Sequence, residues 1–397
     1  MIDSIKCTVM HPTQNLFGDA LQRYLNDRYT TALRRQTVQS EQGWSAEVWG
    51  ELADLGLLGT CLAERHGGLE ASASDMMGLM TAFGRHLVVE PFVSTAVVGG
   101  SVFSRLDDAK WPNMLLGGSM RLALAAEEKA HGLLQVDVST VADAVEGGYR
   151  ITGGKIVVRD APSATHFLVS AKLAESGNFA LFLVPARGAR LEMDCYRLID
   201  AIPAADLRFD GAIVPDSSLL SAGQPALSLL SQALNHATAA VCAEALGVMR
   251  AMLDQTVAYT TQRKQFGVPL KNFQVLQHRM ADMYVEIEQA CSLTLRAYSC
   301  LHDDAAVSSA KIRVNQALRL VSHESVQMHG AIGTTDEIPL SSYFRRAAAI
   351  ERQYGSTAEH YQRFEQGLLR GILAVAPERP PVSSARQSNA QRRPVSI

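Results

Sequence analysis

The hydrophobic period of the chain changes twice along its length, and these changes constrain the fold more than any single motif. Up to about residue 119, and again from Ser217 to Leu373, apolar residues recur every three or four positions, which is typical of helices. Between these regions, short runs rich in Val, Ile and Leu are separated by Gly, Asp, Asn and Pro, which is typical of strands. We therefore expect an N-terminal α-helical domain over residues 1–119, a middle β domain over 120–219 and a C-terminal helical domain over 220–375.

Individual elements follow from the same pattern. The expected helices cover Asn15–Tyr29, Trp44–Gly56, Asp75–Leu87, Ala237–Thr261, Phe273–Leu301, Ala305–Met328 and Thr357–Leu373. In the β domain, the glycine pairs Gly147-Gly148 and Gly153-Gly154 predict hairpin turns. Residues 376–397 have no hydrophobic period and many Pro, Ser, Gln and Arg residues, so we expect a disordered tail there.

Composition excludes several classes of protein. The chain has 37 basic and 40 acidic residues, a net charge of −3, so its charge balance does not favour binding to nucleic acid or to a membrane surface. Neither the six cysteines nor the histidines have metal-ligand spacing, and no apolar run reaches about 18 residues. The N-terminus lacks the pattern of a signal peptide. We therefore expect a cytoplasmic protein without a metal site, and the absence of G-x-G-x-x-G and Walker A motifs excludes the usual nucleotide loops.

The stretch from Thr260 to Glu288 combines a basic opening with a strongly periodic helix. Pro269 cannot lie inside a helix, so one helix must end before it and another begin after it. Arg263 and Gln265 then lie in the connection between two helices, which is a suitable place to bind an anion. On pattern alone, a hairpin of two core helices explains the same residues.

Three segments carry a resemblance to a known family. They are LADLGLLGTCLAERHGGLE at Leu52–Glu70, RKQFGVPLKNFQVLQHRMADM at Arg263–Met283, and QMHGAIGTTDE at Gln327–Glu337, which YFRR follows at Tyr343–Arg346. Over about residues 15–370 the chain resembles the acyl-CoA dehydrogenases, flavoproteins that oxidise acyl-CoA thioesters at the α,β carbons. The resemblance implies an α+β fold with an N-terminal helical domain, a middle β-barrel domain and a C-terminal four-helix bundle.

The resemblance further implies an FAD bound between domains and across a subunit boundary. Arg263, Gln265 and Phe266 would contact the diphosphate and adenosine of an FAD in a neighbouring subunit, since a planar guanidinium can bridge two phosphate oxygens. The other implied cofactor contacts are Phe273, Gln274, Gln327, His329, Gly330, Ala331, Thr357, Glu359 and Arg159. From the residues alone, Arg263 could also form a surface ion pair and Gln327 could cap a helix.

The chemistry of the family requires a carboxylate that removes the α-proton and a flavin that accepts hydride from the β-carbon. The resemblance places that glutamate at Gly355 or, in the family's other arrangement, at about Ala237, and neither residue is acidic. The β domain departs from the pattern as well. AEEKAHG at 126–132 replaces T-E-P-x-A-G-S, and Val157 and Arg159 replace a tryptophan and a threonine beside the flavin ring.

Two explanations fit these departures. Another carboxylate could act as the base, and the candidates near in sequence are Glu351, Glu359, Asp160 and Glu244. Alternatively, this chain works with a second one, since QMHGAIGTTDE, YFRR and QYGSTAEHY resemble the small subunit of pimeloyl-CoA dehydrogenase and other heteromeric bacterial acyl-CoA dehydrogenases. The retained FAD-contact segments beside a missing base favour the second explanation. A silent partner subunit and a self-sufficient flavin oxidase on the same fold stay open.

The implied partners follow from the resemblance. They are an acyl-CoA substrate with a dicarboxyl, ring-derived or steroid side-chain acyl group, and an electron-transfer flavoprotein or similar acceptor. The implied assembly is a homo- or hetero-tetramer with a second acyl-CoA dehydrogenase chain.

Overall fold

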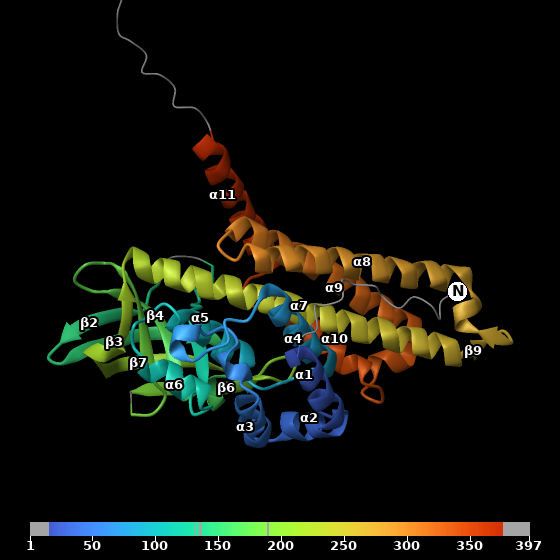
Figure 1. The fold of residues 1–397 in the computed structure, drawn as a ribbon, viewed down its shortest axis with the longest axis horizontal. Coiled ribbons are helices and arrows are strands. Elements are labelled where there is room, and N and C mark those ends of the chain that lie inside the picture. Colours follow the sequence, from blue (N-terminus) through green and yellow to red (C-terminus); the bar gives the residue numbers. More distant parts are fainter. Residues whose placement is uncertain (1–15, 131, 135–136, 189, 376–397) are drawn as a thin grey trace, which may run out of the picture.

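The computed structural model describes residues 16–130, 132–134, 137–188 and 190–375, so the predicted tail at 376–397 lies outside the described residues. Helices come first, then a mixed sheet, then long helices (Figure 1). The predicted order of α, β and α regions and the α+β class are therefore confirmed. None of the helices in the described part is long and apolar enough to cross a membrane.

The N-terminal region contains more helices than the sequence predicted. Its elements are α1 (Leu16–Asp27), α2 (Thr31–Gln39), α3 (Ala46–Asp54), η1 (Leu57–Gly59), η2 (Glu64–His66), α4 (Ala73–His86), η3 (Val93–Gly99), α5 (Gly100–Phe103) and α6 (Lys110–Leu116). Hydroxyl side chains begin three of them, because Thr30, Ser45 and Ser72 each accept a backbone N–H of the first turn of α2, α3 or α4. The unpredicted η3 is a π-helical turn that packs beside α7 and β1.

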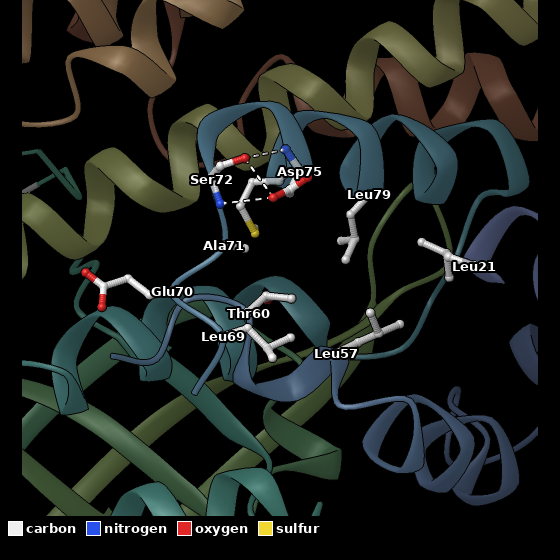
Figure 2. A pocket seen from close by; sticks show the side chains of 10 residues that line it. Leu21, Leu57, Thr60, Leu69, Glu70, Ala71, Ser72, Asp75 and Leu79 are labelled. Atoms are coloured by element: carbon white, nitrogen blue, oxygen red, sulfur yellow. Dashed lines mark hydrogen bonds between the residues drawn. The ribbon is translucent and has the colours of Figure 1, made fainter. Parts of the chain in front are cut away.

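A pocket of about 280 Å³ lies between the N-terminal helices. Figure 2 shows Leu57 and Leu69 on one side of it and Leu79 of α4 on the other. At its edge Ser72 and Asp75 form a reciprocal capping box that fixes the start of α4. None of the residues predicted to bind cofactor lines this pocket.

The middle region forms one sheet of eight strands. They are β1 (Leu122–Ala125), β2 (Val141–Val145), β3 (Gly148–Arg159), β4 (His166–Leu173), β5 (Phe179–Pro185), β6 (Leu191–Arg197), β7 (Pro203–Pro215) and β8 (Leu219–Ala222). The strand order is β6-β7-β3-β2-β4-β5-β8, and β1 pairs with β4. Its buried face is aliphatic and aromatic, with Phe167, Phe182 and Phe209 almost fully enclosed.

The two predicted glycine turns have different outcomes. The first predicted turn is present one residue earlier, because Glu146 and Gly147 connect β2 to β3 and Gly148 begins β3. The turn predicted at Gly153-Gly154 is wrong, because both residues lie inside β3 and pair with Phe209 and Arg208 of β7. Gly153 is needed there for close packing, since a Cβ atom would come within 2.7 Å of Thr140.

The C-terminal region consists of long helices joined by one small hairpin. Its elements are α7 (Gln224–Gln262), β9 (Lys264–Gln265), β10 (Val268–Pro269), η6 (Leu270–Asn272), α8 (Gln274–Ser299), α9 (Asp304–His329), η7 (Gly330–Thr334), α10 (Leu340–Ile350) and α11 (Thr357–Val375). Helix α7 begins 13 residues before the predicted Ala237 (237 − 224), and α10 was not predicted. Figure 1 shows α7 running from the sheet to the hairpin at the far end of the molecule.

Two glycines allow α4 and α7 to pack closely. A Cβ atom on Gly84 would overlap the backbone carbonyl of Glu244, and one on Gly247 would overlap the backbone of Thr81 and Arg85. The N-terminal and C-terminal regions therefore meet backbone to backbone, and no side chain can separate them at this point.

Because of this crossing, we expect alanine substitution to destabilise the protein at Gly247 but not at a glycine with open space around it. We expect Gly247→Ala to lower the free energy of unfolding by about 1–3 kcal/mol, because the helices must move apart. Gly50→Ala is the matched control, since Gly50 lies in α3 with nothing within 4 Å of its Cβ position. The control should be neutral or stabilising by up to about 1 kcal/mol. Thermal or urea unfolding measures both, and equal effects would contradict the tight crossing.

Candidate functional site

The connection after α7 is a two-residue hairpin that points outward. Strands β9 and β10 pair Gln265 with Val268, and Phe266 and Gly267 form the turn with φ of +54° and +81°. Positive φ at both positions is the geometry of a tight hairpin turn, but it is uncommon for a phenylalanine. The Phe266 side chain is 92% exposed, and its ring meets the edge of Phe273 at 6.3 Å.

The polar side chains of this hairpin have free donors. Arg263, Gln265 and Gln274 are exposed, and no side-chain hydrogen bond or ion pair to them is found in the described part of the chain. The surface ion pair considered for Arg263 is therefore not seen among these residues. A guanidinium, two amides and an aromatic edge are held together in solvent, and such a set suits a phosphate next to an aromatic base.

A second predicted segment lies at the same end of the helical region. Helix α9 ends at His329, whose ring stacks on Tyr259 of α7 with centroids 4.4 Å apart. Tyr259 accepts the backbone N–H of Arg263 through its carbonyl oxygen, so the stack fixes the end of α9 against the base of the hairpin. Gln327, Gly330 and Ala331 are exposed here, and Gln327 makes no side-chain capping bond in the described part. His329 itself is buried, its Nδ1 lies 2.7 Å from the carbonyl of Ser325, and burial lowers its pKa.

Of the remaining predicted residues, Arg159 lines a cleft of about 500 Å³ between β3, the β6–β7 connection and α10, whereas Thr357 and Glu359 are not among its lining residues. Its walls are mainly aliphatic, and its polar lining residues are Ser94, Glu127, Arg159, Arg352 and Gln353. Val157, with φ of +50°, exposes a small aliphatic side chain on the wall, at the position where the resemblance implies a tryptophan. Tyr354, the residue before Gly355, also lines this cleft.

A buried network of charges lies behind the cleft. Arg346 of α10 donates from Nε and Nη2 to the two carboxylate oxygens of Glu244 on α7, at 2.6 and 2.7 Å. Its Nη1 donates to Asp200 at 2.7 Å, and Arg159 donates to the same Asp200 oxygen at 2.9 Å. Burial alone would raise the pKa of Asp200, but Arg159 and Arg346 outweigh it and hold that pKa at about 2. Two carboxylates and two guanidiniums thus neutralise each other where the middle and C-terminal regions meet.

Gly355 and Ala237, the two positions at which the resemblance places the base, are both enclosed. Ala237 is fully buried in α7. Gly355 is buried with φ of +109°, and a Cβ there would come within 2.8 Å of both His360 Nε2 and Leu134 Cδ1. His360 is fixed by contacts to the Tyr354 carbonyl at 3.0 Å and the Ser308 hydroxyl at 3.2 Å. Space for a glutamate side chain is therefore missing at Gly355.

The four alternative carboxylates are all engaged in structural contacts. Glu351 pairs with Arg319 at 2.9 Å and Glu244 with Arg346, while Asp160 accepts the Ser94 hydroxyl at 2.6 Å. Glu359 caps α11 by accepting the backbone N–H and hydroxyl of Ser356 at 2.8 and 2.7 Å. Thr357, at the start of the same helix, accepts a hydrogen bond from Asn315 at 3.0 Å.

Sequence reasoning missed three residues that shape the cleft. Glu127 is its acidic lining residue, and burial together with the negative charge of Glu359 raises its pKa. Asp200 and Arg346 form the network behind it. Arg346 stood in the recognised YFRR segment, but the sequence gives no signal that pairs it with Asp200, 146 positions away.

The predicted residues therefore form two groups that a single chain keeps apart. Arg263–Gln274 and Gln327–Ala331 lie at the hairpin end, whereas Arg159 lines the cleft and Gly355 follows its lining residue Tyr354. From Glu244, behind the cleft, to Gln262, at the hairpin, α7 spans 18 residues (262 − 244), or about 27 Å at 1.5 Å per residue. Within the described part no cluster of His, Cys, Asp and Glu could hold a metal ion.

The charge network predicts an acid-sensitive contribution to stability. The folded-state pKa of Asp200, about 2, lies below its ordinary value of 3.8, so its contribution is present above pH 4 and is lost as pH falls toward 2. We expect Asp200→Asn to lower the free energy of unfolding at pH 7 by about 2 kcal/mol, and the difference from wild type to shrink below pH 4. Asp194→Asn, on the exposed face of β6, is the control and should change little. Urea unfolding at pH 7 and pH 3 measures both, and a pH-independent difference would contradict the ion pairs.

Comparison with known proteins agrees with this architecture. Residues 11–105 match the model of the acyl-CoA dehydrogenase N-terminal domain, and residues 227–367 match that of the C-terminal domain. The chain is 27% identical to benzylmalonyl-CoA dehydrogenase of Aromatoleum aromaticum over 84% of its own length and 91% of the relative's. It is 26% identical to acyl-CoA dehydrogenase FadE27 of Mycobacterium tuberculosis, with the same coverage.

Among solved structures, a variant of the Tcur3481-Tcur3483 steroid ACAD superposes with a TM-score of 0.81 at 29% identity, covering 90% of this chain and 98% of that one. The ChsE4-ChsE5 complex of Mycobacterium tuberculosis superposes with a TM-score of 0.80 at 24% identity, covering 89% and 96%, which shows the shared fold. The two family models cover more than half of the chain. The chain therefore belongs to the acyl-CoA dehydrogenase family.

Proposed function

We propose that this protein is a subunit of an FAD-dependent acyl-CoA dehydrogenase that removes hydrogen from the α and β carbons of an acyl-CoA thioester. One observation carries the proposal. The hairpin presents free donors and an exposed aromatic ring outward, about 27 Å along α7 from the network behind the chain's own cleft. A contact group placed this way serves a cofactor in a neighbouring chain better than one in its own.

The residues of the hairpin fit the diphosphate and adenosine of FAD. Arg263 has planar donors that can bridge two phosphate oxygens, Gln265 and Gln274 can donate to further oxygens, and Phe266 offers a ring face. Bound FAD would supply the acceptor for hydride from the β-carbon. The chain's own contribution is to hold the cofactor and to exclude water where Phe266 packs.

The acyl group is proposed to be dicarboxyl, ring-derived or a steroid side chain. Two of the similar proteins support this proposal. One is benzylmalonyl-CoA dehydrogenase, whose name denotes an acyl group with a second carboxyl, and the other is a steroid ACAD. The partners we propose are a second acyl-CoA dehydrogenase chain that carries the base, and an electron-transfer flavoprotein or similar acceptor.

A second candidate function is a catalytically silent partner that only completes the flavin site of the base-bearing chain. The enclosure of Gly355 by Leu134 and His360 favours it, together with the structural engagement of the four alternative carboxylates. Purification with and without the neighbouring chain separates the two functions. Thioester oxidation that needs both chains, and that is lost when the cleft of this one is blocked, supports the first.

Substitution at the hairpin tests the cofactor role. We expect Arg263→Gln to weaken FAD binding by the two-chain assembly about 10–100-fold, because a charged hydrogen bond to phosphate is lost. Arg296→Gln, an exposed arginine near the other end of α8, is the matched control and should leave FAD binding unchanged. Flavin absorbance after gel filtration and fluorescence titration measure the effect. Unchanged affinity in Arg263→Gln would sink the proposed role of the hairpin.

Substitution at Gly355 tests whether the missing base can be restored. We expect Gly355→Glu to lower the melting temperature and to give the chain no thioester oxidation of its own, because φ of +109° and two close neighbours leave no room for the side chain. Gly177→Ala is the control for backbone strain alone, since Gly177 has φ of +68° and open space around it. Oxidation of glutaryl-CoA or pimeloyl-CoA by the variant without a partner would contradict this expectation.

A further inference from the structure

The two segments that the proposed function assigns to the cofactor come from distant parts of the sequence. One is Arg263–Gln274, at the hairpin, and the other is Gln327–Ala331, at the end of α9, with all of α8 between them. A cofactor that contacts both segments binds most tightly when their separation is fixed before it arrives. Contacts that fix this separation therefore contribute to binding, even where they never touch the cofactor.

A ring stack joins these two segments. The His329 ring lies on the Tyr259 ring with centroids 4.4 Å apart and planes inclined by 26°. Among the described residues, no side-chain hydrogen bond or ion pair connects Gln327–Ala331 to Arg263–Gln274. The relative position of the two segments therefore depends strongly on this stack.

Each ring of the stack is tied to its own segment through the backbone. The Tyr259 carbonyl accepts the Arg263 N–H at 2.8 Å, and the Arg263 carbonyl accepts the Leu270 N–H at 2.8 Å, which closes the hairpin. On the other side, His329 is the last residue of α9, and its Nδ1 lies 2.7 Å from the carbonyl of Ser325. The His329 side chain is only 6% exposed, so little of it is available to a cofactor at the surface.

We propose that Tyr259 and His329 are positioning residues that hold the Gln327–Ala331 segment at the separation from the hairpin that the cofactor needs. The inference rests on the proposed function and deepens it. It adds Tyr259 to the site, and it gives His329 a role through Tyr259 in place of direct contact with the cofactor. Without the stack, the end of α9 occupies several positions, and only the fraction that places both segments correctly binds the cofactor. The apparent affinity falls by that fraction.

Substitution of the rings tests this role through cofactor affinity. FAD is titrated into the two-chain assembly after its flavin has been removed, and flavin fluorescence reports binding. We expect Tyr259→Leu to bind FAD about 2–10-fold more weakly, the usual worth of an aromatic pair. Tyr259→Phe should restore wild-type affinity, because it keeps the ring. His329→Leu should match Tyr259→Leu, and the double variant should be about as weak as either single one, since both changes remove the same stack.

Gly247→Ala is the matched control for a loss of stability alone. It lies in the same helix 12 residues away (259 − 247), and its close neighbours are in α4. This variant should leave FAD affinity unchanged, although it destabilises the fold.

Amide hydrogen exchange of the assembly is a second measurement, and it needs no cofactor. We expect Tyr259→Leu to speed exchange in Gln327–Ala331 about 2–10-fold, because the end of α9 opens more often, and Tyr259→Phe to leave it at the wild-type rate.

Four outcomes would overturn the inference. They are wild-type affinity in Tyr259→Leu, failure of Tyr259→Phe to restore it, additive weakening in the double variant, and unchanged exchange in Gln327–Ala331. If Arg263→Gln weakens FAD binding but Tyr259→Leu does not, this inference alone fails. An assembly that binds no FAD would refute the proposed function, and hydrogen exchange would still decide whether the stack holds the two segments together.

Discussion

The buried guanidinium of Arg346 is the interaction on which the arrangement of the three regions depends. It binds both oxygens of Glu244 on α7 and one oxygen of Asp200 in the β6–β7 connection, so it fixes the middle sheet to the C-terminal helices. The N-terminal region meets the same place, because the backbone of Glu244 is where α4 crosses α7 at Gly84. Loss of a charged partner from such a buried set destabilises the fold, because it leaves a charge with less counter-charge. Glu244 thus meets the N-terminal region through its backbone, and Arg346 links it to Asp200 of the middle region.

This interaction also decides what the cleft can do chemically. A catalytic base must be a carboxylate that is free to take a proton, with a pKa near the working pH. Asp200, with a pKa of about 2, does not meet this requirement, because two guanidinium groups keep it ionised and bound. The same ion pairs that hold the wall of the cleft therefore remove Asp200 from acid–base chemistry, whereas Glu127 lines the cleft itself and is not part of this network. Arg159 differs from Asp200 in this respect. Asp200 fixes its position but leaves most of its N–H donors available for hydrogen bonds.

The sequence was sufficient for the parts of the fold that depend on local periodicity. The long helices α8 and α9 were predicted to within a few residues, because their apolar faces repeat over 26 residues each. Helix α10 was missed because it has only 11 residues and its buried side includes the charged Arg346. The turn predicted at Gly153-Gly154 is absent because this glycine pair lies inside β3, where Gly153 allows Thr140 to approach closely. The pairing of Arg346 with Asp200 and the enclosure of Gly355 by Leu134 depend on contacts between distant segments, which no local pattern encodes.

The hairpin after α7 also has features that contacts within one chain do not explain. Within one chain, Phe266 has two unfavourable properties: a left-handed backbone conformation and an aromatic ring that is 92% exposed. Each costs free energy that nothing in the described part of the chain returns, apart from the edge contact with Phe273. A molecule that covers this ring would remove it from water, and the donors of Arg263 and Gln265 beside it are available to an acceptor on such a molecule. The conformation of the hairpin is thus a local feature of this chain, and under the proposed function its cost in free energy is offset by a cofactor bound across its surface.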